Sequence, residues 1–216
     1  MKKVVGIISY FVDNKDVREY RKHRLLRLIE RFNELFDLPI QIVAQNYNKE
    51  EVELFSHLKN VSLDLQPKLG ISGAREHLRK WFVTSSFDYI ILIDDDVILK
   101  GKSADEYLRQ IEEHPDCFME FTKSRHQLMA ISKYCYSQVS YTDVEPERGE
   151  GFEDRIVYNK LCKLLPDRHF CFKDTGLVEE AVATKDEYST WYTNQDIQQM
   201  LENTFKIINN IGDKNQ

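Results

Sequence analysis

Cysteine is scarce in this sequence, and its few occurrences are not spaced as bridges or paired metal ligands. The four cysteines of the 216-residue chain are Cys117, Cys135, Cys162 and Cys171, and they form no Cys-x-x-Cys pair. Wide spacing without such pairs argues against a disulfide scaffold and against a structural zinc site. We therefore expect reduced thiols, as in a cytoplasmic protein.

Long hydrophobic runs are also missing. The apolar run near the amino terminus is short, is soon followed by Asp13 and has no small-residue cleavage site, so it does not fit a signal peptide. No other segment has the length of a membrane-spanning helix, and we expect no transmembrane segment. Glycine and proline number only 8 and 5, and no low-complexity linker divides the chain. We therefore predict a single domain over residues 1–216.

The sequence also lacks an excess of positive charge. The chain has 30 Lys and Arg against 36 Asp and Glu, which gives a formal net charge of −6 and a sequence pI of about 5.6. Because phosphate backbones repel a negative protein, we expect no nucleic-acid partner. Hydrophobic residues make up 42% of the chain and aromatic residues 12%, which is enough for a sizeable packed core.

What the sequence does contain is a run of three aspartates directly after an apolar segment. Residues 89–93 are mostly β-branched and predict a strand that is buried on both faces, and Asp94, Asp95 and Asp96 follow it. Adjacent carboxylates repel one another, and a cation that prefers hard oxygen ligands, Mg²⁺ or Mn²⁺, relieves the repulsion. Ligands bind at the carboxyl ends of strands in open α/β sheets. The run therefore predicts a metal site with a phosphorylated ligand; the alternative is a solvated acidic turn.

Apolar periodicity divides the chain into alternating strands and helices. The predicted strands are residues 3–11, 40–45, 61–65, 89–93, 117–121, 127–132 and 169–172. The predicted helices are residues 17–36, 50–58, 104–113 and 152–165, one that residues 68–76 open and that ends near 85, and a last one that begins at 193–196. This alternation indicates the α/β class, with a single, mostly parallel sheet flanked by helices and room for antiparallel strands late in the chain.

Three segments have both an ordinary and a functional interpretation. The helix at 17–36 has a basic face, which is typical of a solvated surface. The glycine-rich helix start beside Arg75 suits a phosphate, but it also fits an ordinary helix capped by Ser72. Glu153 and Asp154 open a helix, where the helix dipole favours acidic side chains. Carboxylates presented after a glycine-containing loop can equally hold a general base near an acceptor.

In their order and setting, the two acidic groups resemble the DxD and ED motifs of GT-A fold glycosyltransferases. The likeness is closest to inverting families, namely the β-1,4-galactosyltransferase-like and the cellulose-synthase-type groups. Three segments carry it: Ala74-Arg75, residues 89–97, and residues 129–161 with Glu153-Asp154. The resemblance implies a GT-A fold whose nucleotide-binding half is residues 1–100 and whose acceptor-binding half is residues 101–216.

The resemblance also implies how a donor is held. Asp94 and Asp96 would bind Mn²⁺ or Mg²⁺ on the diphosphate of a nucleotide sugar, expected to be a UDP-sugar. Asp95 would face the sugar or the ribose. Arg75 would contact the phosphates or order the nucleotide site.

Further residues acquire roles from the same resemblance. Ser9 and Tyr10, at the end of the first strand, would line the base pocket. Asp154 would be the general base that deprotonates the hydroxyl of a saccharide or glycoconjugate acceptor, and Glu153 would hydrogen-bond that acceptor. The implied reaction inverts the anomeric centre and needs no covalent nucleophile.

The sequence departs from these families at three places. Gln45 stands where the cellulose-synthase-type group has an acidic turn, and Glu76 stands where an asparagine often follows Ala-Arg. A histidine that would serve as a third metal ligand is not evident, because His169 is expected to be an ordinary strand residue.

Two other functions fit part of the sequence. In a haloacid dehalogenase-like phosphatase, Asp94 would be the nucleophile, Asp96 the acid, and Glu153-Asp154 the metal-holding pair. That motif normally lies on the first strand of its fold, whereas here it follows a long α/β stretch. The remaining alternative is a non-catalytic nucleotide-binding module with the same fold.

Overall fold

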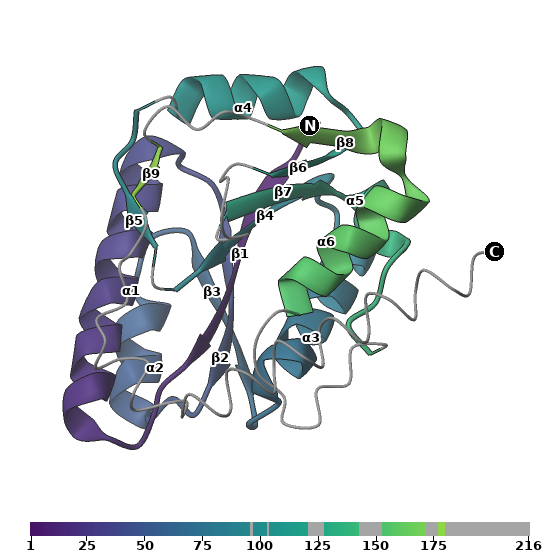
Figure 1. The fold of residues 1–216 in the computed structure, drawn as a ribbon. Coiled ribbons are helices and arrows are strands. Elements are labelled where there is room, and N and C mark those ends of the chain that lie inside the picture. The colour runs from purple at the N-terminus through teal and green to yellow at the C-terminus, as the bar shows by residue number, and fades with distance from the viewer. Residues whose placement is uncertain (96, 103, 121–127, 143–152, 172–176, 180–216) are drawn as a thin grey trace.

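The computed structural model describes residues 1–95, 97–102, 104–120, 128–142, 153–171 and 177–179. Its centre is a seven-stranded sheet with the strand order β3-β2-β1-β4-β7-β6-β8 (Figure 1). These strands are β1 (Lys3–Tyr10), β2 (Ile40–Gln45), β3 (Val61–Gln66), β4 (Tyr89–Asp94), β6 (Phe118–Glu120), β7 (Leu128–Ser132) and β8 (His169–Cys171). A small antiparallel sheet of β5 (Ile98–Leu99) and β9 (Val178–Glu179) lies apart from it.

Most neighbouring strands of the main sheet run parallel. β1 pairs in parallel with β2 and with β4, β2 with β3, and β6 with β8. Only β7, between β4 and β6, is antiparallel to its neighbours. The predicted α/β fold with a mostly parallel sheet flanked by helices is therefore confirmed, and the small β5–β9 sheet is an addition that the sequence did not indicate.

Helices cover both faces of the sheet (Figure 1). One face is covered by α1 (Lys15–Leu35), α2 (Lys49–Ser56) and α4 (Ala104–Glu113). The other is covered by α3 (Gly70–Thr84), α5 (Lys133–Ser137) and α6 (Glu153–Leu164), and the short helix η1 (Pro166–Arg168) follows α6. Successive strand residues point to opposite faces, so Ile91 and Ile93 of β4 join the first apolar cluster and Ile90 and Leu92 the second. Burial on both faces explains the unbroken apolar run of this strand.

The close approach of α3 to β1 depends on Gly6. A Cβ atom at this position would lie 2.7 Å from Cδ1 of Ile90 and 2.9 Å from Cδ2 of Leu78, well inside the usual contact distance between carbon atoms. The missing side chain leaves room for Leu78 of α3 against the sheet. Gly6 thus helps to set the position of the helix that carries Arg75.

The structure corrects several details of the predicted elements. Ser72 is not the N-cap of α3, because the helix begins earlier, at Gly70, after Leu69, which makes no side-chain cap bond. Gly70 has a φ of 71°, a backbone conformation that glycine adopts easily. Helix α5 was not predicted, because five residues are too few to show helical periodicity. The helix predicted from residues 193–196 and most of the polar loop at 140–151 lie outside the described residues.

Two predictions from absent features can be compared with the structure. All four cysteines are free thiols, as predicted. In the described parts of the chain, no helix combines the length and the apolar character needed to cross a bilayer.

Candidate functional site

The carboxyl ends of three parallel strands bring most of the predicted donor-binding residues to one edge of the sheet. Ser9 and Tyr10 end β1, Gln45 ends β2, and Asp94 ends β4. Strand register aligns Ile8 with Asp94, and Tyr10 with Gln45. The structure therefore brings together residues that are far apart in the sequence, at the edge where α/β folds hold ligands.

Asp94 faces the helix that carries Arg75. The Arg75 guanidinium is buried, with its side chain 3% exposed, and Nη2 donates to Oδ1 of Asp94 at 2.5 Å. The Asp94 side chain is 33% exposed, so its carboxylate lies between a buried cation and the surface. A charge-assisted bond of this kind fixes the carboxylate and offsets part of its repulsion from Asp95.

Two buried hydroxyl groups near the ends of β1 and β2, Ser9 Oγ and Tyr47 Oη, have no hydrogen-bond partner among the described residues. Burial raises the pKa of Tyr47, and the negative charge of Asp95 raises it further. The nearby Ser9 hydroxyl lowers the pKa of Tyr47, but by less than burial raises it. The hydroxyl groups of Ser9 and Tyr47 do not meet the geometry of an ordinary hydrogen bond. The phenol therefore stays protonated as a donor. Tyr47 was not singled out in the sequence, because only the strand order places it beside the end of β1.

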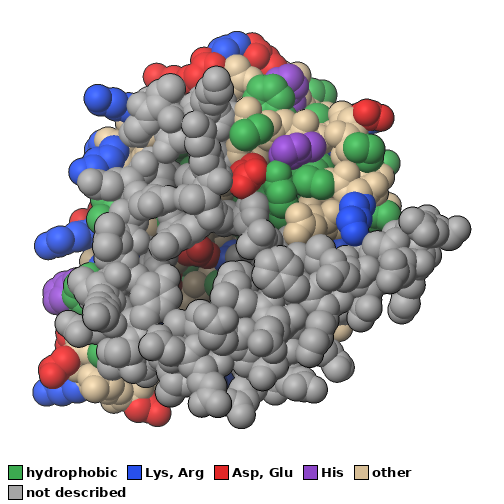
Figure 2. Space-filling model, viewed as in Figure 1, with side chains coloured by type: hydrophobic (Ala, Val, Ile, Leu, Met, Phe, Trp, Pro, Cys, Tyr) green, Lys and Arg blue, Asp and Glu red, His purple; other side chains and the backbone are tan. Residues whose placement is uncertain are grey.

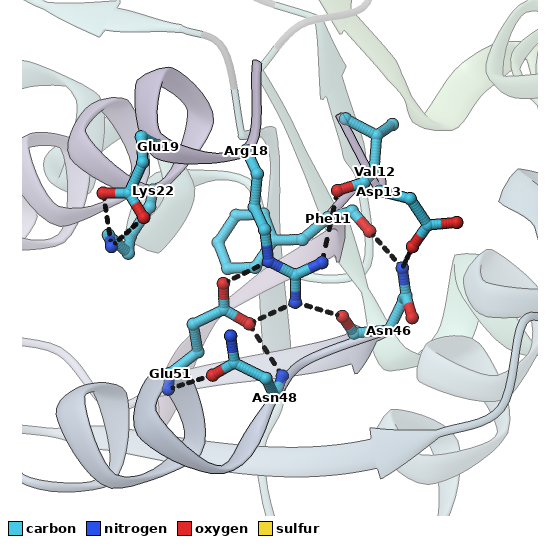
Figure 3. Close-up of polar contacts among 9 residues, drawn as sticks. All are labelled: Phe11, Val12, Asp13, Arg18, Glu19, Lys22, Asn46, Asn48 and Glu51. Atoms are coloured by element: carbon cyan, nitrogen blue, oxygen red, sulfur yellow. Dashed lines mark hydrogen bonds and ion pairs between the residues drawn. The ribbon is translucent and has the colours of Figure 1, made fainter. Parts of the chain in front are cut away.

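The chain that leaves β1 is held by two arginines of α1, Arg18 and Arg21, of which Figure 3 shows Arg18. Arg18 makes two bonds of 2.5 Å to the carboxylate of Glu51 and donates to the carbonyl oxygens of Val12 at 3.2 Å and Asn46 at 2.7 Å. Arg21 donates to the carbonyl of Tyr10 at 3.0 Å. Part of the basic helix face that the sequence suggested to be solvated therefore braces the edge of the sheet.

The amino terminus of α3 meets the same edge. Gln45 accepts a hydrogen bond from the Leu69 N–H through Oε1 at 2.7 Å, so Gln45 orders the start of α3. The Lys68 Nζ lies 5.2 Å from the ring centre of Tyr10. Ser72 lies in the first turn, and its Oγ is buried without a hydrogen-bond partner in the described part of the chain.

Glu76 is a buried structural residue. Its carboxylate pairs with Arg79 at 2.7 Å and accepts the Tyr141 N–H at 2.9 Å. Burial alone would raise the pKa of Glu76, but these donors outweigh it and lower the pKa to about 2. Glu76 therefore fastens the chain near Tyr141 to α3, next to Arg75.

The second acidic group opens α6, on the same face of the sheet as α3. Glu153 and Asp154 are the first residues of this helix, and their side chains lie outside the described part of the structure. The end of α6 is followed by η1 and then by β8, which runs parallel to β6. α6 must therefore run against the parallel strands, with its first turn toward their carboxyl ends (Figure 1). This direction puts residues 153 and 154 on the face and toward the edge where Asp94 and Arg75 lie.

The carboxylates at the end of β4 are the type of ligand that binds a divalent cation. Asp94 and Asp95 are half-buried and offer the oxygen ligands that Mg²⁺ and Mn²⁺ prefer. Asp96 lies outside the described residues. Among the residues that the structure describes, no three His, Cys, Asp or Glu side chains converge as a complete metal site.

His169 lies in β8, as expected of a strand residue. Its Nε2 is 2.8 Å from the hydroxyl of Tyr158, and its ring stacks on Phe118.

Comparison with known proteins identifies the fold. No protein-family model and no curated protein matches the sequence. Solved structures do match: TarS 1–349 from S. aureus in complex with UDP-GlcNAc superimposes with a TM-score of 0.62 at 14% identity, covering 89% of this chain and 62% of that one. The mannosyltransferase PcManGT from Pyrobaculum calidifontis, in complex with GDP-Man and Mn²⁺, gives 0.60 at 12% identity, covering 95% and 64%. This chain has a GT-A-like fold.

A third matching structure is described as an enzyme with a different activity from that of the mannosyltransferase PcManGT. A protein from Bacillus anthracis, assigned as a glucose-1-phosphate thymidylyltransferase, matches with a TM-score of 0.60 at 13% identity, over 92% of this chain and 93% of its own. At such identities the likeness establishes the fold and leaves the reaction to the site. The chain also spans less than two thirds of the TarS 1–349 and PcManGT structures.

Proposed function

We propose that this protein is a glycosyltransferase that moves a sugar from a nucleotide-diphosphate donor, a UDP-sugar in the first instance, to a hydroxyl of a saccharide or glycoconjugate. The observation that carries this proposal is the Arg75–Asp94 pair at the carboxyl end of β4 in a GT-A-like fold. TarS and PcManGT, which share the fold, were solved with UDP-GlcNAc and with GDP-Man and Mn²⁺. The chemistry of the edge, acidic with one buried cation, suits a metal-bound diphosphate.

At the donor end, Asp94 and Asp96 would hold Mn²⁺ or Mg²⁺, while Asp95 faces the sugar or the ribose. When bound, the ion supplies positive charge that offsets the charge developing on the leaving diphosphate. Arg75 keeps Asp94 in place and orders the nucleotide site. Ser9 and Tyr10 line the base pocket, where the end of β1 is held by the arginines of α1.

At the acceptor end, Asp154 is the general base and Glu153 hydrogen-bonds the acceptor. The acceptor oxygen attacks the anomeric carbon as its proton passes to Asp154, and the bond from that carbon to the diphosphate oxygen breaks with its electron pair. Attack opposite the leaving group inverts the anomeric centre. The support for this assignment is that the first turn of α6 is directed toward the edge and face that hold Asp94.

A product assay tests the proposal. The full chain is incubated with Mn²⁺, a panel of nucleotide sugars and a panel of acceptor saccharides, and release of the nucleoside diphosphate is followed together with the anomeric configuration of the product. We expect acceptor-dependent release and an inverted product. Asp154→Asn should lower transfer at least about a hundredfold with donor binding intact, and Asp105→Asn, an exposed matched control on α4, should not change it. Full activity of Asp154→Asn would remove Asp154 as the base.

Nucleotidyl transfer is a second candidate, because the B. anthracis protein matches over nearly the full length of both chains. The products separate the two reactions: nucleotidyl transfer to a sugar phosphate releases pyrophosphate from a nucleoside triphosphate, whereas glycosyl transfer releases a nucleoside diphosphate.

The GT-A-like fold gives no support to the phosphatase alternative, whose motif belongs on a first strand. A nucleotide-binding module without activity would bind nucleotide in this assay and give no product.

A further inference from the structure

Tyr158 of α6 joins the helix to two strands through a single hydroxyl group. Its Oη donates to Oε2 of Glu120, the last residue of β6, at 2.8 Å, and lies 2.8 Å from Nε2 of His169 in β8. The Tyr158 ring meets Phe118 edge-on at 6.0 Å and His169 edge-on at 5.4 Å between centroids. Three elements that are distant in sequence therefore converge on one side chain.

The direction of these hydrogen bonds follows from the groups involved. A carboxylate only accepts hydrogen bonds, so the single proton of the Tyr158 hydroxyl is committed to Glu120. The Tyr158 oxygen must then accept from His169, which fixes the proton of that ring on Nε2. Burial raises the pKa of Tyr158 and the bond to Glu120 raises it further, so the phenol remains a donor at all ordinary pH.

The apolar contacts of α6 do not by themselves define where its first turn lies. Ile156, Val157 and Leu161 are buried in the cluster shared with α3, and apolar burial is not directional. Hydrogen bonds are directional, so the two at the Tyr158 hydroxyl restrict how α6 can rotate and shift along its axis.

The repeat of the α-helix relates Tyr158 to position 154, where the general base is proposed. Positions 154 and 158 are four residues apart, so they lie on the same side of α6, one turn from each other. A helical side chain covers the turn that precedes its own Cα atom, which for Tyr158 is the turn containing position 154.

We propose that Tyr158, held by Glu120 and His169, is a positioning residue that sets the place of Asp154 at the acceptor side of the site. This inference rests on the proposed function, because that proposal puts the general base at position 154. Reacting groups lose rate steeply when they are displaced by as little as about 1 Å. Loss of the hydroxyl should therefore affect turnover more than donor binding.

The test compares Tyr158→Phe with Tyr134→Phe, a matched loss of a hydroxyl at an exposed position on α5. We expect Tyr158→Phe to lower kcat for transfer about tenfold or more, with the donor KM within about twofold of the wild type. We expect Tyr134→Phe to behave as the wild type. Glu120→Gln, which keeps an acceptor for the hydroxyl, should retain more activity than Glu120→Ala.

A second measurement does not depend on activity. In Tyr158→Phe, the amide hydrogens that close the first turn of α6, those of residues 157–159, should exchange with solvent faster, while those of β1 and β4 stay unchanged. Unchanged exchange in this turn overturns the inference, as does a variant in which kcat, donor affinity and Tm fall together. If the wild type transfers no sugar, the proposed function fails, and exchange alone decides whether Tyr158 positions the helix start.

Discussion

Arg75 shows how one buried side chain ties the acidic run to the fold. Its guanidinium donates a hydrogen bond to the carboxylate of Asp94, the residue that precedes Asp95 in the sequence. Arg75→Met removes the cation that this carboxylate faces, and we expect the free energy of unfolding to fall by about 1–3 kcal/mol. Urea unfolding measures this. Lys80→Met, an exposed control on the same helix, should stay within about 0.5 kcal/mol of the wild type. Equal stability of the Arg75 and Lys80 variants would contradict the structural role of the pair.

Glu76 gives a pH dependence with a definite sign. Its folded-state pKa of about 2 lies below the ordinary value of 4.5, so its contribution is complete above pH 4.5 and is lost as the pH falls toward 2. The pKa difference corresponds to about 3 kcal/mol at most. Glu76→Gln should therefore be less stable than the wild type at pH 6, with the gap closing as the pH falls through this window. Urea unfolding at several pH values checks this, and a constant gap would show that the carboxylate is not held as described.

Single residues also mark the limit of prediction from the sequence. Asp94 and Arg75 could be singled out because each belongs to a local pattern, a strand end and a helix start. Tyr47 and the Gln45–Leu69 bond could not, because both depend on which strands lie side by side. The sequence also fitted a helix capped by Ser72, and that interpretation was wrong because the helix begins earlier, at Gly70.

At the scale of elements, the brace between α1 and the start of α2 keeps the ends of β1 and β2 in place. The Arg18 side chain is 15% exposed and that of Glu51 3%, so their ion pair is largely shielded from water. Arg18→Met leaves a buried carboxylate without this partner, and we expect a loss of about 2–4 kcal/mol in unfolding free energy. Arg27→Met, at an exposed position of the same helix, is the matched control for urea unfolding. Equal stability of the two variants would show that the brace contributes nothing.

Helices and strands were predicted correctly where a segment was long enough to show its hydrophobic period. Strand β2 and helix α4 have the predicted boundaries, and the other strands of the main sheet differ from prediction by at most a residue or two at either end. The five-residue α5 and the two-residue β5 and β9 are too short to show a period, so no local pattern indicated them.

At the scale of the whole molecule, the sequence predicted the class and the mostly parallel sheet, but not where the antiparallel strand would be inserted. β7 lies between β4 and β6, and its place follows from long-range pairing that no local pattern encodes. Figure 2 shows one face of the molecule, on which described Asp and Glu side chains lie among hydrophobic and other side chains. Strand order and the direction of α6 together bring the two acidic segments toward one edge of the sheet.

The most direct test of this account is a calorimetric titration of UDP, and in parallel GDP, with Mn²⁺ into three forms of the full chain: wild type, Asp94→Asn and the exposed control Asp105→Asn. We predict that the wild type and Asp105→Asn bind one of these nucleotides equally well. Asp94→Asn should bind it at least tenfold more weakly, a loss of about 1.4 kcal/mol. Undiminished binding by Asp94→Asn, or no binding by the wild type, would contradict the claim that the end of β4 holds a nucleotide diphosphate.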